Sequence, residues 1–257
     1  MNPYENIFSL SGKTALVAGA SRGIGLAIAQ ALSAAGASTI LAARSMDKLE
    51  AHAKDLRGAR ALYLDFTKPE SIRAAAQTAG AVDILVNVSG TNIRKRFTDF
   101  TREEYERILQ TNLHGIFELT QLIGAKMIER NAGGKVINIG SLMSLLGLPY
   151  LAVYAISKGG LAQLTRVLAA EWGRHNIQVN CIAPGFIITD LNRAMWQPPE
   201  MEAWLKRAQA NPRLGRPEDV APLAVFLAGK GGDYITGQII AVDGGYSTTA
   251  VWPHEPA

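Results

Sequence analysis

Short apolar runs alternate with longer amphipathic stretches along the chain. Seven runs rich in β-branched and other apolar residues are candidate strands, at residues 14–19, 38–43, 61–65, 82–87, 135–141, 177–184 and 238–245. Helical spacing of apolar residues is found near 24–36, 46–57, 69–79, 102–131, 152–175 and 217–228. Strands and helices that alternate in this way predict a parallel sheet with helices on both faces. We therefore expect a doubly wound α/β fold, Rossmann-like, around a seven-stranded parallel sheet.

The composition fits a well-packed globular chain. It has 257 residues, of which 48% are hydrophobic, and no Pro/Ser-rich linker or shift in composition divides it. We expect a single domain over residues 1–257. Residues 186–215 break the strand and helix alternation with "WQPPE" and "ANPRLGRPED". This segment is expected to be a partly helical insertion that covers a binding site.

Charge and cysteine content exclude several function classes. The net charge is only +4 and the basic residues are spread along the chain, which does not favour nucleic acid as a partner. Cys181 is the sole cysteine and the four histidines lack ligand spacing, so we expect neither disulfides nor a metal site. No basic leader with an apolar core and no membrane-length apolar run is present. A cytoplasmic protein that does not bind membranes is predicted.

A glycine-rich turn follows the first predicted strand. The segment "GASRGIG" places Gly19, Gly23 and Gly25 at the start of a predicted helix. A turn without side chains lets the backbone approach a pyrophosphate, and the helix N-terminus supplies free N–H groups and partial positive charge. Glycine turns also serve tight helix–strand packing alone, but the strand, turn and helix context favours dinucleotide binding.

The glycine spacing, Gly-x-x-x-Gly-x-Gly, resembles that of the short-chain dehydrogenase/reductase (SDR) family, and further family motifs follow in order over residues 10–246. They are "NVSG" at 87–90, Asn112 in "TNLHG", Ser141 in "IGS", Tyr154 with Lys158, and Pro184 with Gly185 in "APGFIITD". The family segment after the fourth strand reads Asn-Asn-Ala-Gly, so Val88 and Ser89 depart from it, as does Ala18 before the first glycine. These positions mainly use their backbone, and we discount the departures modestly.

The resemblance implies a role for each matched residue. Tyr154 would be the general acid or base, Ser141 would hydrogen-bond the substrate oxygen, and Asn112 would hold a water in a proton relay. Lys158 would bind the ribose of a nicotinamide cofactor. The implied cofactor-binding residues are Gly19, Ser21, Arg22, Gly23, Ile24, Gly25, Arg44, Asp65, Asn87, Gly90, Tyr154, Lys158, Pro184, Gly185, Ile187 and Thr189.

The pair Tyr154 and Lys158 also has a physical explanation. Four residues apart on a helix, the two side chains share one face. A free tyrosine has a pKa near ~10, and a cation about 4 Å away lowers it by up to ~3 units. We therefore expect Lys158 to bring the pKa of Tyr154 toward neutrality. Alone, the pair would be better explained as a packed aromatic beside a snorkelling lysine.

The end of the second predicted strand indicates the cofactor. An acidic residue there would bind the adenosine ribose and repel a 2′-phosphate, but this chain has Ala43 followed by Arg44. Together with Arg22 in the glycine turn, Arg44 favours NADP(H). Either arginine could instead be a solvated surface charge. Asp65 resembles the family's adenine-contacting acid and could equally be a turn residue.

A basic cluster follows the fourth predicted strand. "TNIRKRF" contains Arg94 on a loop at the carboxyl end of the sheet, where ligands of doubly wound folds bind. With "IGSLMSLLG", this loop resembles the gluconate 5-dehydrogenase and 2-deoxygluconate 3-dehydrogenase branch of the family. The substrate-binding residues are then Arg94, Ser141 and Tyr154. A solvated basic loop or a tetramer contact explains the cluster about as well.

These observations predict an NADP-preferring oxidoreductase that transfers a hydride between nicotinamide and a carbonyl or secondary alcohol, with a sugar acid as the candidate substrate. The alternatives are a 3-oxoacyl carrier-protein reductase and a non-catalytic NADP-binding regulator on the same fold. The apolar stretch 221–228 and the tail "GQIIAVDGGYS" resemble the family's subunit contacts. They predict a homotetramer, although 221–228 could be an ordinary core helix.

Overall fold

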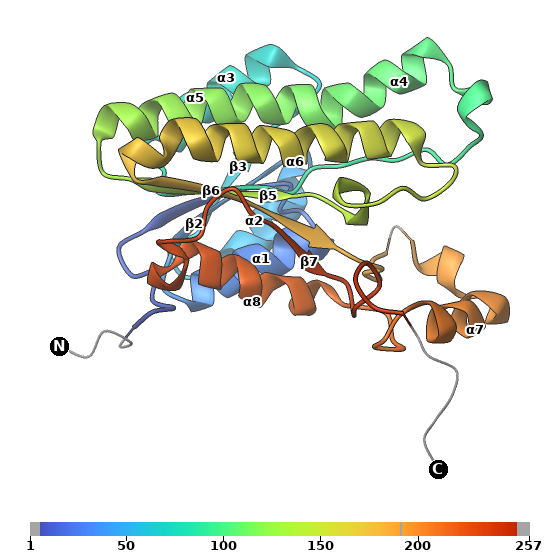
Figure 1. Cartoon of the computed structure of the whole chain (residues 1–257). Helices are drawn as coiled ribbons and strands as arrows, with labels where there is room; N and C mark the ends of the chain where they lie inside the picture. Colours follow the sequence, from blue (N-terminus) through green and yellow to red (C-terminus); the bar gives the residue numbers. More distant parts are fainter. Residues whose placement is uncertain (1–5, 191, 251–257) are drawn as a thin grey trace.

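The computed structural model of the chain describes residues 6–190 and 192–250, and these form a seven-stranded parallel sheet (Figure 1). The strands are β1 (Thr14–Ala18), β2 (Ser38–Ala43), β3 (Arg60–Tyr63), β4 (Ile84–Asn87), β5 (Gly134–Ile139), β6 (Ile177–Pro184) and β7 (Ile239–Val242). Their order across the sheet is β3-β2-β1-β4-β5-β6-β7. The predicted doubly wound α/β fold is confirmed.

Helices cover both faces of the sheet (Figure 1). Helices α3 (Pro69–Ala79), α5 (Gly115–Arg130) and α6 (Ala152–Trp172) lie on one face, and α1 (Gly23–Ala34), α2 (Met46–Lys54) and α8 (Pro217–Ala228) lie on the other. Neighbouring residues of a strand enter opposite cores, as Leu16 and Val17 of β1 do. Burial on both faces is why residues 15–18 of β1 and 84–86 of β4 are continuous apolar runs.

The strand order places a topological switch point between β1 and β4. Strand β1 pairs with β2 on one side, where Leu16 is opposite Ile40, and with β4 on the other, where Leu16 is opposite Leu85. The chain therefore winds outward in both directions from this point. All carboxyl ends lie at the same edge of the sheet, and ligands of such folds bind there.

The helix predicted over 102–131 is interrupted in the structure. It consists of α4 (Arg102–Leu109), a π-helical turn (Gln110–His114) and α5. The turn is held against the segment after β3, where Gln110 Nε2 donates to the carbonyl of Phe66 at 3.1 Å. The periodicity of apolar residues carries no signal for such a turn, because its hydrogen bond is made to a distant segment of the chain.

The insertion at 186–215 is present and is closed at its base. It contains a 3₁₀ turn (Arg193–Trp196) and helix α7 (Pro199–Ala208). Its two ends meet in an isolated parallel bridge between Ile187 and Gly215. The Gly215 N–H donates to Phe186 at 2.9 Å, and the Ile188 N–H donates to Gly215 at 2.8 Å. The insertion is therefore a loop with adjacent ends.

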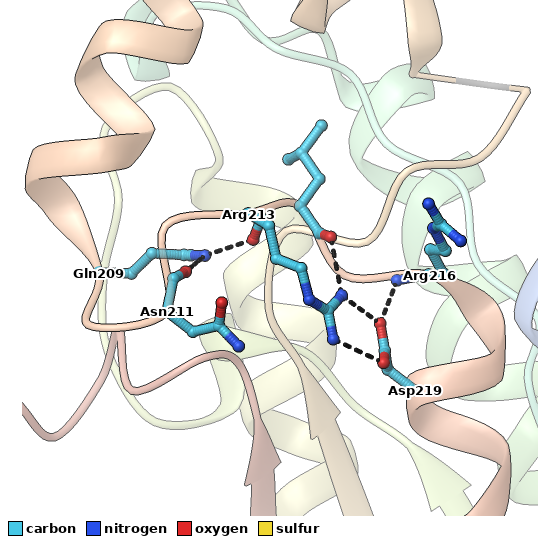
Figure 2. Close-up of polar contacts among 6 residues, drawn as sticks. Gln209, Asn211, Arg213, Arg216 and Asp219 are labelled. Atoms are coloured by element: carbon cyan, nitrogen blue, oxygen red, sulfur yellow. Dashed lines mark hydrogen bonds and ion pairs between the residues drawn. The ribbon is translucent and has the colours of Figure 1, made fainter.

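A polar network fastens the C-terminal end of the insertion to α8 (Figure 2). Arg213 binds Asp219 through two parallel contacts of 2.7 and 2.8 Å, and the N–H of Arg216 donates to the same carboxylate at 2.7 Å. Gln209 Nε2 donates to the carbonyls of Asn211, at 2.5 Å, and Arg213, at 2.6 Å. The Arg213 guanidinium lowers the pKa of Asp219 to about 2, so this pair stays charged at neutral pH.

The described residues contain neither a membrane-spanning helix nor a cluster of metal-binding side chains. Within residues 6–190 and 192–250, no helix combines the length and apolar character needed to span a bilayer. No group of three or more His, Cys, Asp or Glu side chains suited to a metal ion occurs in that same part of the chain. His254 lies outside the described residues.

Candidate active site

The turn after β1 requires glycine at the predicted positions. Gly19 has a φ of +107°, and a Cβ atom there would lie 3.0 Å from the backbone nitrogen of Ser89. Gly23 has a φ of +56°, and a Cβ atom on Gly25 would lie 2.1 Å from the carbonyl oxygen of Gly19. Any larger residue at Gly25 would collide with backbone, so the turn can fold tightly into α1 only with glycine.

The N-terminus of α1 fits a pyrophosphate. Its N-cap residue, Arg22, makes no capping hydrogen bond with its side chain, and the first turn contains no acidic residue. The first N–H groups and the positive end of the helix dipole are therefore available to an anion. Thr189 of the insertion lies beside this turn, since a Cβ on Gly23 would be 3.5 Å from Thr189 Cγ2. Ser21 belongs to the same turn, and Ile24 packs on the core behind it.

Arg44 and Asp65 lie near each other at the carboxyl ends of β2 and β3. Burial raises the pKa of Asp65, but hydrogen bonds from the Thr67 N–H at 2.9 Å and hydroxyl at 2.8 Å, with the charge of Arg44, bring it below the ordinary value. The Asp65 carboxylate thus accepts two hydrogen bonds from Thr67 in the following turn. Neither Arg22 nor Arg44 has a side-chain hydrogen bond or ion pair with another described residue, which leaves both free for a phosphate.

Ser141, Tyr154 and Lys158 come together as the motifs predicted. Tyr154 and Lys158 lie on the first turns of α6, with Lys158 Nζ 5.8 Å from the centre of the Tyr154 ring. Ser141 follows β5 and begins the 3₁₀ turn Leu142–Ser144. Its Oγ accepts the N–H of Met143 at 3.2 Å, and its side chain interacts with the phenol of Tyr154. The hydroxyl groups of Ser141 and Tyr154 are therefore neighbours at the start of α6.

The expected effect of Lys158 on Tyr154 is wrong in this structure. Burial raises the pKa of Tyr154 above its ordinary value, and the opposing influences are the Ser141 hydrogen bond and the positive charge of Arg94. Lys158 is directed at the backbone instead of the phenolic oxygen. Desolvation penalises the phenolate more than the neighbouring groups favour it. Tyr154 is consequently a neutral proton donor near pH 7.

Lys158 is almost fully buried, with 2% of its surface exposed. Its Nζ donates to the carbonyl of Ile139 at 2.8 Å. Burial lowers the pKa of Lys158 to about 8, with Cys181 on β6 acting weakly in the opposite direction. The same burial raises the pKa of the Cys181 thiol to about 11. Near neutrality, Lys158 is thus a protonated ammonium beside a neutral thiol.

Asn112 lies in the π-helical turn and fixes the segment after β4. Its Oδ1 accepts the Thr91 N–H at 2.7 Å, and its Nδ2 donates to the Thr91 carbonyl at 2.8 Å and to Ser157 Oγ at 3.2 Å. A Cβ atom on Gly90 would lie 3.6 Å from Lys158 Nζ. The π turn, a feature often found at functional sites, thus holds Gly90 over Lys158.

The side chain of Asn87 turns away from this edge of the sheet. It is fully buried, and its Nδ2 donates to Thr120 Oγ1 on α5 and to Asn138 Oδ1 on β5, both at 2.9 Å. Asn138 in turn donates to Thr165 Oγ1 on α6 at 2.9 Å. This chain of polar groups ties the sheet to its helices. The two Nδ2 hydrogens of Asn87 are thus used inside the protein, while its Oδ1 is buried without a hydrogen-bond partner among the described residues.

The residues after β6 lead from the sheet into the insertion. Pro184 ends β6, and the Gly185 N–H donates to Val242 of β7 at 2.9 Å. Ile187 packs into the core on the α1 and α8 side, and the Thr189 N–H donates to Asn192 Oδ1 at 2.8 Å. Of these four residues, Thr189 is the one that lies against Gly23 of the glycine turn.

An aromatic cluster of the insertion packs near Tyr154. The Phe186 ring makes edge-to-face contacts with Trp196, Trp204 and Tyr246 at centroid distances of 5.4, 5.3 and 4.9 Å. Phe186, Tyr246 and Tyr154 all pack on the same small core around Leu142. The insertion therefore lies close to Tyr154.

Arg94 is exposed and has no hydrogen bond or ion pair with any other described residue. Its charge nevertheless lowers the pKa of Tyr154, so the guanidinium lies within electrostatic reach of the phenol. The next residue, Lys95, is bonded on both its backbone and its side chain. Arg94 is thus a free cation at the edge of the site.

Known proteins match the chain over nearly its whole length. The family model described as enoyl-(acyl carrier protein) reductase matches residues 19–247. Gluconate 5-dehydrogenase of Gluconobacter oxydans is 34% identical, over 96% of this chain and 99% of the relative. 2-Dehydro-3-deoxy-D-gluconate 5-dehydrogenase of Bacillus subtilis is 40% identical, over 96% and 99%. The chain belongs to the short-chain dehydrogenase/reductase family.

A solved structure of this family agrees with the fold. The gluconate 5-dehydrogenase from Burkholderia cenocepacia, in complex with NADP and tartrate, superposes with a TM-score of 0.91 at 35% identity, covering 95% of this chain and 99% of that one. The predicted SDR enzyme class and the resemblance to the gluconate 5-dehydrogenase branch are confirmed.

The structure explains the departures from the SDR motif after β4. The Val88 N–H donates to the Ala18 carbonyl at 2.8 Å, and the Ser89 nitrogen lies against Gly19. The backbone at these positions holds the glycine turn, so their side chains are free to vary.

Sequence reasoning missed several residues of this SDR site. Thr91, Ser157 and Ile139 all bond to the predicted catalytic residues, two of them through the backbone. Backbone partners leave no residue-type signal. Thr91 directly follows the "NVSG" motif, and this adjacency was the available indication for it.

Proposed function

We propose that this SDR is an NADP-preferring oxidoreductase that transfers a hydride between nicotinamide and the carbonyl or secondary alcohol of a sugar acid of the gluconate or ketogluconate type. The observation that carries the proposal is the convergence of Ser141 and Tyr154 with the charge of Arg94. A proton donor beside a free cation suits a substrate with both a carbonyl and an anionic group. The names of the Gluconobacter and Burkholderia relatives support this substrate class.

The cofactor is assigned to the carboxyl edge of the sheet around β1 and β4. The glycine turn and the α1 N-terminus take the pyrophosphate, Lys158 takes the ribose hydroxyls, and Arg22 and Arg44 take the 2′-phosphate. When bound, the nicotinamide supplies or accepts the hydride. The NADP in the Burkholderia relative supports the choice. The remaining proposed contacts are Ser21, Ile24, Asp65, Asn87, Gly90, Pro184, Gly185, Ile187 and Thr189.

Tyr154 is the proposed general acid in reduction and general base in oxidation. In reduction the π electrons of the C=O bond move to oxygen, which takes the phenolic proton while Ser141 donates a hydrogen bond to it. The raised pKa keeps this proton in place until the oxygen becomes basic. The positive charge of Arg94 and the Ser141 hydrogen bond then favour the phenolate. Asn112 is assigned the water of the relay that restores the proton.

An NADPH-oxidation screen tests this proposal. The substrates are 5-ketogluconate, a neutral ketose of equal carbon number and an acetoacetyl thioester. We expect 5-ketogluconate to be preferred, and Arg94→Ala to raise its KM about 10- to 100-fold, the loss of one charged hydrogen bond of ~1.5–3 kcal/mol. Arg96→Ala, at an exposed arginine two residues away, is the matched control and should leave KM unchanged.

Other outcomes identify the alternatives. Efficient reduction of the thioester, with no activity on any sugar acid, would establish a 3-oxoacyl carrier-protein reductase. NADPH binding without turnover of any carbonyl compound would favour the non-catalytic regulator. The homotetramer, the single domain and the cytoplasmic location stay predictions, to be tested by light scattering, limited proteolysis and fractionation.

A further inference from the structure

The loop between β4 and α4 carries two adjacent cations in opposite situations. Arg94 has no polar partner among the described residues, whereas Lys95 is bonded through both its side chain and its backbone. Lys95 Nζ lies 2.9 and 2.7 Å from the two carboxylate oxygens of Glu104. The same ammonium stands 5.5 Å from the centre of the Phe100 ring. Lys95 is thus an ordered residue next to a free one.

The partner of Lys95 is itself fixed. Glu104 forms a capping box at the start of α4, in which its Oε2 accepts the Thr101 N–H at 2.9 Å and its own N–H donates to Thr101 Oγ1 at 3.3 Å. The hydrogen bond from Lys95 lowers the pKa of Glu104, so the carboxylate is charged at neutral pH. About a quarter of each side chain is exposed, at 26% for Lys95 and 25% for Glu104. The ion pair between Lys95 and Glu104 therefore attaches the loop after β4 to the N-terminus of α4 and restricts the motion of the loop.

The backbone of Lys95 makes a second connection, toward the catalytic helix. Its N–H donates to the carbonyl of Tyr150 at 3.2 Å. Tyr150 has a φ of +67°, an uncommon conformation for a side chain of this size, and lies four residues before Tyr154. Lys95 thus joins the loop of Arg94 to the segment that leads into α6.

We propose that Lys95, held by Glu104 and Tyr150, is a positioning residue that orients Arg94 toward the anionic group of the substrate. This inference rests on the proposed function, in which Arg94 binds that group. Successive Cα atoms are about 3.8 Å apart, so fixing Lys95 fixes the origin of the Arg94 side chain. A cation whose backbone is already ordered loses less freedom when it binds an anion.

The variant Lys95→Met tests whether the charge of Lys95, and not the packing of its stem, positions Arg94. Methionine keeps an apolar stem over Phe100 but removes the charge that Glu104 holds. We expect KM for 5-ketogluconate and Kd for tartrate to rise about 3- to 10-fold, the range for losing the order of one flexible side chain. The KM of the neutral ketose and kcat should change less than about 2-fold. Lys95→Arg should restore binding because it keeps the ion pair.

The decisive experiment is a double-mutant cycle with Arg94→Ala. Tartrate binding to the enzyme–NADP⁺ complex is measured by calorimetry, which does not depend on turnover, and KM is measured alongside. If Lys95 acts through Arg94, Lys95→Met should have almost no further effect once Arg94 is alanine. Arg102→Met is the control, because it breaks a different ion pair on the same helix, with Glu106.

The outcomes distinguish the two proposals. Three results would overturn the role of Lys95 and leave the anion site standing. Lys95→Met could change the tartrate Kd equally with and without Arg94, it could raise the KM of the neutral ketose as much as that of 5-ketogluconate, or it could change none of these values. An unchanged tartrate Kd in Arg94→Ala, or a wild-type enzyme that binds neither anion, overturns the anion site and the role of Lys95 with it. If Lys95→Met does not fold, Glu104→Gln removes the same ion pair from the other side and should give the same charge-selective loss.

Discussion

Replacing Lys158 with methionine is expected to remove a rise of about 3 kcal/mol that the free energy of unfolding of the wild type shows between pH 7 and 10.5. Burial lowers the pKa of Lys158 from an ordinary value of 10.5 to about 8. One pKa unit corresponds to about 1.4 kcal/mol, which gives about 3 kcal/mol as the free energy that the buried ammonium costs the folded chain. Methionine has a similar stem and no charge, so it removes this cost together with the hydrogen bond to Ile139.

The sign follows from where the proton is bound. Below about pH 8, Lys158 is protonated in both the folded and the unfolded chain, and the full cost is present. Between about 8 and 10.5 the folded chain has lost this proton while the unfolded chain keeps it, so the free energy of unfolding of the wild type rises with pH. The Met variant lacks this rise. Its stability relative to the wild type should therefore fall by about 3 kcal/mol between pH 7 and 10.5.

The assay is urea unfolding at several pH values and one protein concentration. A Cys181→Ala background is used throughout, because burial raises the pKa of this thiol to about 11 and its titration would oppose that of Lys158. The comparison is then between Cys181→Ala alone and Cys181→Ala with Lys158→Met. A stability difference that stays constant within about 1 kcal/mol from pH 7 to 10.5 would refute a depressed pKa for Lys158.

Three further predictions concern the site. Tyr154→Phe should leave NADPH affinity nearly unchanged and lower kcat at least ~10²-fold, and a variant with most of its activity would contradict the acid–base role. Ala43→Asp with Arg44→Leu should shift kcat/KM from NADPH toward NADH by about 10- to 100-fold, whereas equal wild-type values for both cofactors would exclude a phosphate contact. Gly25→Ala should abolish cofactor binding and cost at least about 1–3 kcal/mol in urea unfolding, because its Cβ would lie 2.1 Å from backbone. Gly173→Ala, where a Cβ meets nothing within 4 Å, is its control and should behave as the wild type.

Much of the fold could be predicted because its signals are local. An interior parallel strand is buried on both faces, so residues 15–18 of β1 form the unbroken apolar run that burial requires. The glycine turn was equally predictable, since its conformation tolerates no side chain at Gly25. The π turn at Asn112 was not, because it depends on side-chain bonds to Thr91 and Ser157, which lie on other segments.

The sequence by itself determined the seven strands and most of the helices, the carboxyl edge where the ligand loops gather, and the residue types brought there. Each of these follows from periodicity, glycine geometry or motif order. Only the tertiary structure decided how these residues act on one another. Lys158 donates to the carbonyl of Ile139, and the pKa of Tyr154 is set by burial, by the Ser141 hydrogen bond and by the charge of Arg94. A pKa depends on desolvation and on charges from distant segments, and neither is encoded in the four-residue spacing of Tyr154 and Lys158.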